Sequence, residues 1–168
     1  LAAAELLEQH NSVVADVWSV TSFTELRRDG METERWNRLH PGDPPRQAYI
    51  TQQLSGREGP VVAATDYVRT FADGVREFVP RTYTVLGTDG FGRSDYRVRL
   101  RRFFEVDRHH VAVAALAALA RDGVVGPATV VGADVDEPLG TIVVVSPTPA
   151  TIVVTPATTA DGAAPAAF

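Results

Sequence analysis

A glycine-containing loop is the part of this sequence whose residue types most readily suggest chemistry. It joins a predicted strand to a predicted helix, the position at which ligands gather in open α/β sheets. Backbone amides and a helix N-terminus at such a position can hold an anion. Its candidate anion-binding or structural residues are Asp89, Gly90, Phe91, Gly92, Arg93 and Ser94, with Arg93 as the clamp. Asp95 stands where a dinucleotide-binding loop needs its third glycine, so a tight βα turn that requires glycine is the alternative.

No residue of the chain is predicted to be catalytic, to bind a cofactor or to hold a metal. There is no cysteine and all 16 basic residues are arginine, which excludes thiol nucleophiles, thiolate ligands and Schiff-base lysines. His109 and His110 are adjacent on a predicted helix, where successive side chains point to different faces, so they cannot chelate one metal together. His40 precedes a proline and is predicted to be a loop or packing residue.

An arginine-rich stretch raises the possibility of nucleic-acid binding. Three acidic residues partly neutralise it, and helical spacing assigns its aromatic residues to a buried face. A solvated face or a subunit contact is therefore favoured, with no nucleic-acid partner. The residues concerned are Arg93, Arg97, Arg99, Arg101, Arg102 and Arg108, with Tyr96, Phe103 and Phe104 between them and Asp95, Glu105 and Asp107 as the acidic neighbours.

Several helices are predicted to position the loop. Ser22 and Glu25 form a capping box, and the helix that they open is expected to stop at Gly30. Ser94 and Asp107 are predicted to cap two later helices. The expected helical ranges are 1–9, 22–30, 32–39, 47–54, 66–79 with a stripe of Val68, Phe71, Val75 and Phe78, 94–104 with an inner face of Tyr96, Leu100, Phe103 and Phe104, and 107–120.

Short segments rich in β-branched residues predict strands at 13–18, 60–64 and 83–86. Strands that alternate with helices indicate an α/β domain with three layers and a mainly parallel sheet. Three strands are few for such a sheet, and the chain begins inside a helical pattern without a start signal. We therefore expect an N-terminally incomplete domain whose first strand lies upstream of residue 1.

The composition changes after residue 121, which predicts one domain over 1–121 and an irregular or disordered tail over 122–168. The tail holds the acidic excess, since the body balances 16 basic against 16 of the 21 acidic residues. Two valine-rich segments in it, 141–145 and 151–154, are read either as a hairpin or as a low-complexity extension. No apolar run is long enough for a membrane helix, so a soluble, intracellular protein without a membrane partner is predicted.

Four blocks in the body together resemble one family, the C-terminal, transketolase-like domain of the homodimeric pyruvate dehydrogenase E1 component. The resemblance covers about residues 1–121. The blocks are DVWSVTSFTELRRDG at 16–30, ERWN with LHP at 34–41, GPVVAATDY at 59–67 and VLGTDGFGRSD at 85–95, followed by FFEVD at 103–107.

This resemblance implies that the full enzyme decarboxylates pyruvate on thiamine diphosphate with Mg²⁺ and passes the acetyl unit to the lipoyl group of an E2 acetyltransferase. It also implies that the cofactor lies in other domains of a cytoplasmic homodimer, because their Gly-Asp-Gly…Asn motif does not occur here. The partners of this segment would be the rest of the E1 chain, the second E1 subunit and E2. The segment itself would support the dimer and be inactive alone.

Two other functions remain open from the sequence. One is a free-standing α/β module that binds an anion or small ligand at the 89–94 loop. The other keeps the fold but changes the enzyme, to transketolase or another 2-oxo-acid decarboxylase, against which the 18–22 and 88–95 blocks argue.

Overall fold

A computed structural model of the chain describes residues 1–131 and 150–154. None of the helices in these ranges is both long and apolar enough to span a membrane. The elements in chain order are α1 (Ala2–Asn11), β1 (Ala15–Trp18), α2 (Phe23–Leu39), α3 (Tyr49–Ser55), β2 (Val61–Ala64), α4 (Arg69–Asp73), the short 3₁₀ helix η1 (Arg76–Phe78), β3 (Tyr83–Leu86), α5 (Arg97–Phe103), α6 (Arg108–Arg121), α7 (Pro127–Val131) and β4 (Ala150–Val154).

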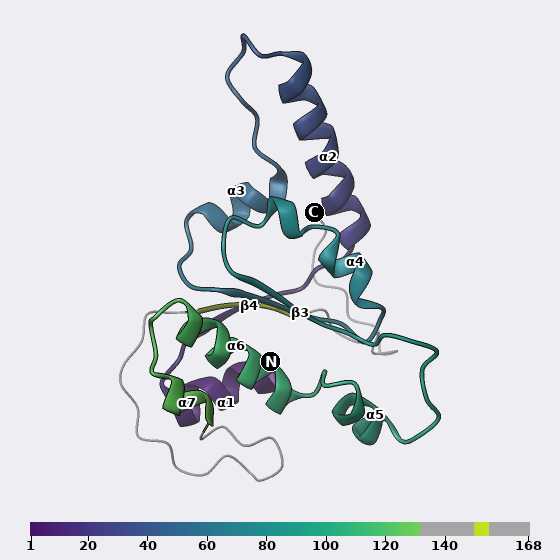
Figure 1. Cartoon of the computed structure of the whole chain (residues 1–168), viewed down its shortest axis with the longest axis vertical. Helices are drawn as coiled ribbons and strands as arrows, with labels where there is room; N and C mark the ends of the chain where they lie inside the picture. Colours follow the sequence, from purple (N-terminus) through teal and green to yellow (C-terminus); the bar gives the residue numbers. More distant parts are fainter. Residues whose placement is uncertain (132–149, 155–168) are drawn as a thin grey trace.

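A parallel sheet with the strand order β1-β4-β2-β3 lies at the centre of the described structure. Strand β2 pairs with β3 from Val61 opposite Tyr83 to Ala64 opposite Leu86. Helices α2, α3 and α4 lie on one face of the sheet, and α1, α6 and α7 lie on the other (Figure 1). The predicted three-layer α/β architecture is therefore confirmed.

The fourth strand comes from the valine-rich sequence near the end of the chain. Residues 150–154 lie between β1 and β2 and pair in parallel with both. Because both edges of β4 are occupied, the expected hairpin between this segment and 141–145 is wrong, whereas the low-complexity composition of the tail stays a prediction. Residues 141–145 and 155–168 lie outside the described residues, so the domain boundary at 121 stays a prediction.

One core of the domain lies between the sheet and the pair α1 and α6. Leu7 and Leu116 are fully buried there, and Val62 and Ala64 of β2 face the same cluster. Small side chains let α6 approach the sheet and α1 closely, since Ala112 and Ala115 are each only 1% exposed. The alanine-rich sequence of α6 therefore reflects packing on two sides.

A second core lies on the opposite face of the sheet. It contains Val61 and Ala63 of β2, which alternate with the residues of the first core, together with Val75, Val85 and Leu54. All four residues of β2 are buried. A strand with no polar face is typical of the interior of a parallel sheet that is covered by helices on both sides.

Helix α2 is continuous, which corrects the prediction of two helices separated at Gly30. Ser22 accepts a hydrogen bond from the amide of Glu25, as the capping box predicts, while the Glu25 carboxylate pairs with Arg28. Gly30 is the one buried residue of α2. A Cβ atom at this position would lie 2.4 Å from the ring of Phe78, so glycine is needed here for close packing rather than for a turn.

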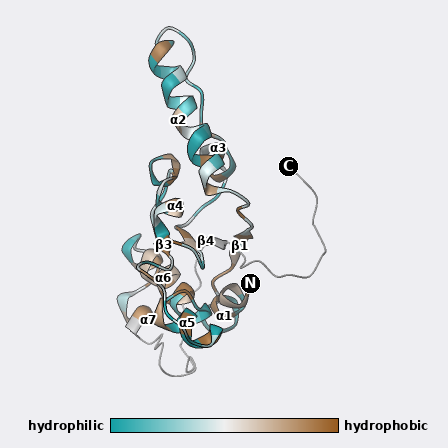
Figure 2. Ribbon diagram, turned by 90° about the vertical axis from the view of Figure 1, so that its right-hand side faces the viewer, coloured by the Kyte–Doolittle hydropathy of each residue, from teal (hydrophilic) through white to brown (hydrophobic). Residues whose placement is uncertain are grey.

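The end of α2 projects away from the sheet as an arm with a largely hydrophilic surface (Figures 1 and 2). The indole of Trp36 packs at the tip of the arm. Its ring stacks on the ring of His40 with the ring centres 4.4 Å apart, and the guanidinium carbon of Arg46 lies 3.7 Å from its ring centre. Asn37 holds the returning chain by accepting from the amide of Arg46 and donating to its carbonyl. His40 is thus the packing residue that the sequence predicts.

The helix expected over 66–79 is wrong in length. Residues 69–73 form α4 and residues 76–78 form η1, with Gly74 at the break between them. The predicted apolar stripe is only partly buried, because Val75 enters the second core and Phe78 is buried against Gly30 whereas Phe71 is 47% exposed.

Helix α6 begins and ends as predicted. The Asp107 carboxylate accepts from the amides of His109 and His110, each at 3.0 Å, and lies 2.8 Å from the ring of His110. Partial burial acts to raise the pKa of Asp107, but these hydrogen bonds outweigh it and hold that pKa below its usual value. Gly123 follows the helix with a φ of 76°, as expected of a residue just beyond a helix end.

Replacing Gly30 with alanine should lower the free energy of unfolding by about 1–3 kcal/mol, because the Phe78 ring must move. Helix propensity alone would act in the opposite sense, by about 1 kcal/mol. Urea denaturation of Gly30→Ala measures the difference. Gly56→Ala is the matched control, since nothing lies within 4 Å of its Cβ position and little change is expected. A Gly30→Ala protein as stable as the parent would contradict the contact.

Asp107→Ala should destabilise the domain by about 1 kcal/mol at neutral pH, through loss of the N-cap. The folded-state pKa of Asp107 is depressed, so its stabilising effect is complete above the pKa of the unfolded chain and disappears as the pH falls through the folded value. Urea titrations of parent and variant should therefore converge in acid. Asp107→Asn keeps a hydrogen-bond acceptor and should therefore lose less stability than Asp107→Ala. If the difference in the free energy of unfolding between the parent and Asp107→Ala did not change with pH, Asp107 would not act as a charged N-cap.

Candidate functional site

The predicted 89–94 loop leaves the carboxyl end of β3 and is fixed at its base. The amide of Thr88 donates to the carbonyl of Tyr67 at 2.9 Å. One oxygen of Asp89 accepts from the amide of Arg69 at 3.2 Å, and the other lies 3.5 Å from the Arg69 side chain. Asp89 thereby satisfies a free amide at the start of α4, whose own N-cap residue, Val68, has no side-chain acceptor.

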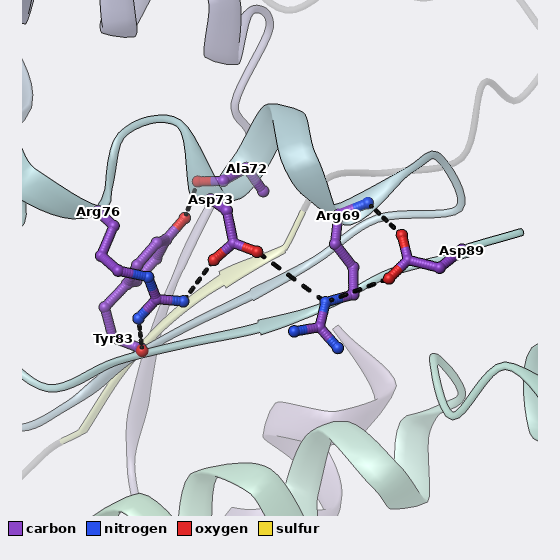
Figure 3. Close-up of polar contacts among 6 residues, drawn as sticks. All are labelled: Arg69, Ala72, Asp73, Arg76, Tyr83 and Asp89. Atoms are coloured by element: carbon purple, nitrogen blue, oxygen red, sulfur yellow. Dashed lines mark hydrogen bonds and ion pairs between the residues drawn. The ribbon is translucent and has the colours of Figure 1, made fainter.

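This contact belongs to a row of alternating charges along α4 (Figure 3). Arg69 also lies 4.0 Å from Asp73, and Asp73 pairs in turn with Arg76. Arg76 then donates to the carbonyl of Tyr83 at 2.7 Å. The row begins after the end of β3 and returns to the start of β3, so it fastens α4 to both ends of one strand.

Tyr83 is the titratable side chain at the buried end of this row. Its hydroxyl donates to the carbonyl of Ala72 at 2.9 Å. Burial is the main cause that raises the pKa of Tyr83 well above its usual value, and the negative charge of Asp73 adds to it. The phenol therefore stays neutral and acts as a structural hydrogen-bond donor.

The two glycines of the loop have the backbone geometry that the turn interpretation requires. Gly90 and Gly92 have φ values of 82° and 76°, a region that favours glycine. Phe91 between them is completely exposed. No atom lies within 4 Å of a Cβ built on either glycine, so backbone angle rather than close approach explains both.

The second half of the loop differs from the prediction. Ser94 does not cap a helix, because α5 begins only at Arg97 and has Tyr96 as its N-cap residue. Tyr96 and Phe103 are 80% and 58% exposed, so the expected buried face of this helix is also wrong. Helical spacing identified a common face but could not tell whether that face packs inside the domain.

Arg93, the predicted anion clamp, lies over the ring of Phe103 with its guanidinium carbon 4.7 Å from the ring centre. Beside it is an open depression of about 350 Å³. Its walls are aromatic, aliphatic and mostly cationic, and are formed by Arg93, Asp95, Arg99, Leu100, Arg102 and Phe103. The engagement of Asp89 with Arg69 and of Arg93 with Phe103 gives the anion-binding alternative no support.

The remaining candidates are not brought together. His110 contacts Asp107, and His40 lies in the arm tip. Among residues 1–131 and 150–154, no group of three or more histidine and acidic side chains is placed to hold a metal ion. What the loop region can do chemically is bind a surface through aromatic rings and guanidinium groups.

Sequence reasoning missed two residues next to the loop. The rings of Tyr67 and Phe71 are 5.3 Å apart, and both side chains are substantially exposed. Their spacing of four residues is the signal that was available. The apolar pattern places Phe71 in a core stripe and does not single out Tyr67, because helical spacing does not show whether a face packs inside the domain.

The family of the chain follows from comparison with known proteins. A family model described as "Transketolase-like TK C-terminal domain" matches residues 1–107. The chain belongs to this family. The match contains the sheet strands β1, β2 and β3, the arm and the 89–94 loop, and it ends before β4.

Curated relatives of this transketolase-like domain are each named pyruvate dehydrogenase E1 component. The Pseudomonas aeruginosa protein is 59% identical over 129 residues, which is 76% of this chain and 15% of that protein. The Cupriavidus necator protein is 56% identical over 75% of this chain and 14% of its own length. The Escherichia coli K12 protein is 57% identical over 72% and 14%. The chain thus spans about one seventh of the length of these relatives.

Asp89→Ala should lower the free energy of unfolding of this transketolase-like domain by about 0.5–2 kcal/mol, because it leaves the Arg69 amide without its acceptor. The ion pair to the Arg69 side chain is half exposed and contributes little. Asp89→Asn keeps an oxygen acceptor without the charge, so it should retain most of the stability in urea denaturation. Equal losses for both variants would show that the charge, rather than the amide contact, matters.

Proposed function

We propose that the chain is the non-catalytic C-terminal domain of a pyruvate dehydrogenase E1 component. The observation that carries this proposal is the 59% identity to the Pseudomonas aeruginosa E1 component over 129 residues, together with the family match at residues 1–107. The geometry agrees, because three titratable side chains in and around the candidate site serve the fold. Asp107 caps a helix, Asp89 holds α4, and Tyr83 is a neutral structural donor.

The full enzyme would decarboxylate pyruvate on thiamine diphosphate with Mg²⁺ and pass the acetyl group to the lipoyl group of E2. The described residues do not fit this cofactor, since they offer no cluster of metal-binding side chains and the charged groups at the base of the loop are engaged. We therefore assign the cofactor and the metal to the rest of the E1 polypeptide.

The partners proposed for this domain are the rest of that polypeptide, the second subunit of an E1 homodimer and the E2 acetyltransferase, in the cytoplasm. Neither nucleic acid nor membrane is among them. The domain proper is proposed to comprise residues 1–121, with 122–168 as a separate tail.

A chimera tests the proposal. In the Pseudomonas aeruginosa E1 component, the 129-residue aligned segment is replaced by the matching segment of this chain. We expect pyruvate-dependent acetylation of E2 to survive, with a loss well below the roughly 100-fold that a misplaced active site causes. The isolated chain should bind no thiamine diphosphate in calorimetry. An inactive chimera beside an active parent, or cofactor binding by the isolated chain, would contradict the assignment.

A further inference from the structure

Large apolar side chains are exposed together in the segment from the 89–94 loop to the end of α5. Phe91 is 112%, Tyr96 80% and Phe103 58% exposed. We call these three residues the aromatic loop face. Isolated exposed apolar residues are common on protein surfaces, but a group of aromatic rings in one short segment is typical of an interaction site.

The segment that carries the aromatic loop face is anchored to the domain at two points. Asp89 fixes the base of the loop to Arg69, and Arg93 lies against Phe103. The positive φ angles of Gly90 and Gly92 direct Phe91 into solvent between these two fixed points. The backbone on both sides of Phe91 is thus anchored, and an aromatic side chain has only two side-chain torsions to order on binding, which suits an anchor residue.

The charge around these rings specifies the complementary surface. The depression beside Phe103 is lined by Arg93, Arg99 and Arg102, and Asp95 is the one carboxylate among its lining residues. Arginine and aromatic residues together are enriched in the centres of protein interfaces. A partner surface that combines acidic side chains with a pocket for an aromatic ring is therefore complementary to it.

The binding partner of the aromatic loop face can be inferred from the charge of this face and from the length of the relatives. A two-fold contact between identical faces would place arginine against arginine, so a second copy of this face does not fit. The face lies within residues 1–107, the part shared with the family, and 85% of the length of the Pseudomonas aeruginosa relative lies outside the aligned segment. The relatives therefore contain a large remaining part of the polypeptide, and this part is the partner that we infer for the face.

We propose that the aromatic loop face docks this domain onto an acidic surface of the rest of the E1 polypeptide, with Phe91 inserted as the anchor. The inference rests on the proposed function and assigns the residues that carry it out. It also explains the glycine-flanked loop, since the backbone at Gly90 and Gly92 exposes the Phe91 side chain and does not bind a ligand.

Hydrogen exchange of residues 88–103 tests the proposal in the isolated 168-residue chain and in the chimeric E1 described above. Exchange should be at least about tenfold slower in the chimera, which corresponds to about 1.4 kcal/mol and lies within the range that burial of an anchor residue contributes. Phe91→Ser in the chimera should restore most of the faster exchange. Leu39→Ser is the matched control, a substitution of an apolar residue that is 56% exposed at the arm tip, and should leave exchange at 88–103 unchanged.

The outcomes separate this inference from the proposed function. An active chimera in which residues 88–103 exchange as fast as in the isolated chain overturns the docking face and leaves the function standing. Protection that appears in the isolated chain with rising concentration identifies a second copy as the occupant and also overturns it. A chimera that neither assembles nor acts, beside an active parent, removes the proposed function and the inference with it. Phe91 is completely exposed, so Phe91→Ser leaves the fold intact.

Discussion

The described structure depends on the burial of β2 on both of its faces. All four residues of this strand are buried, with Val61 and Ala63 in one core and Val62 and Ala64 in the other. A strand of this kind requires helices above and below it and a paired strand on each side. Helices α1 and α6 on one face, and α3, α4 and η1 on the other, follow from that requirement.

Stability and recognition are divided between different parts of the domain. Hydrogen bonds and charge pairs along α4 hold the base of the loop, where Asp89 and Tyr83 have structural roles. The exposed chemistry is carried by arginine and aromatic side chains, which bind surfaces but do not transfer protons at neutral pH. The contacts that hold the fold together are thus separate from the residues of the aromatic loop face.

The sequence predicted much of the fold because local signals decided it. Asp107 and Gly123 marked the ends of α6, and the apolar run at β2 marked a buried strand. The failures at Gly30 and at the inner face of α5 share one cause, which is that sequence spacing does not reveal what packs against a residue. Gly30 predicts a helix end, but in the structure it allows Phe78 to pack against a continuous helix. The spacing of Phe103 predicts a core residue, but its side chain is exposed. For the loop, the glycine geometry could be predicted, whereas the exposure of Phe91 could not.

The position of β4 sets the order in which the sheet can be completed. Strands β2 and β3 are close in sequence and can pair early, but β1 reaches the sheet only through residues 150–154. During synthesis β1 therefore cannot join the sheet until both cores and the segment after them have been made. Pairing over such a sequence separation is slow to form. Until then the open side of β2 is an unpaired edge to which a strand of another nascent chain can bind.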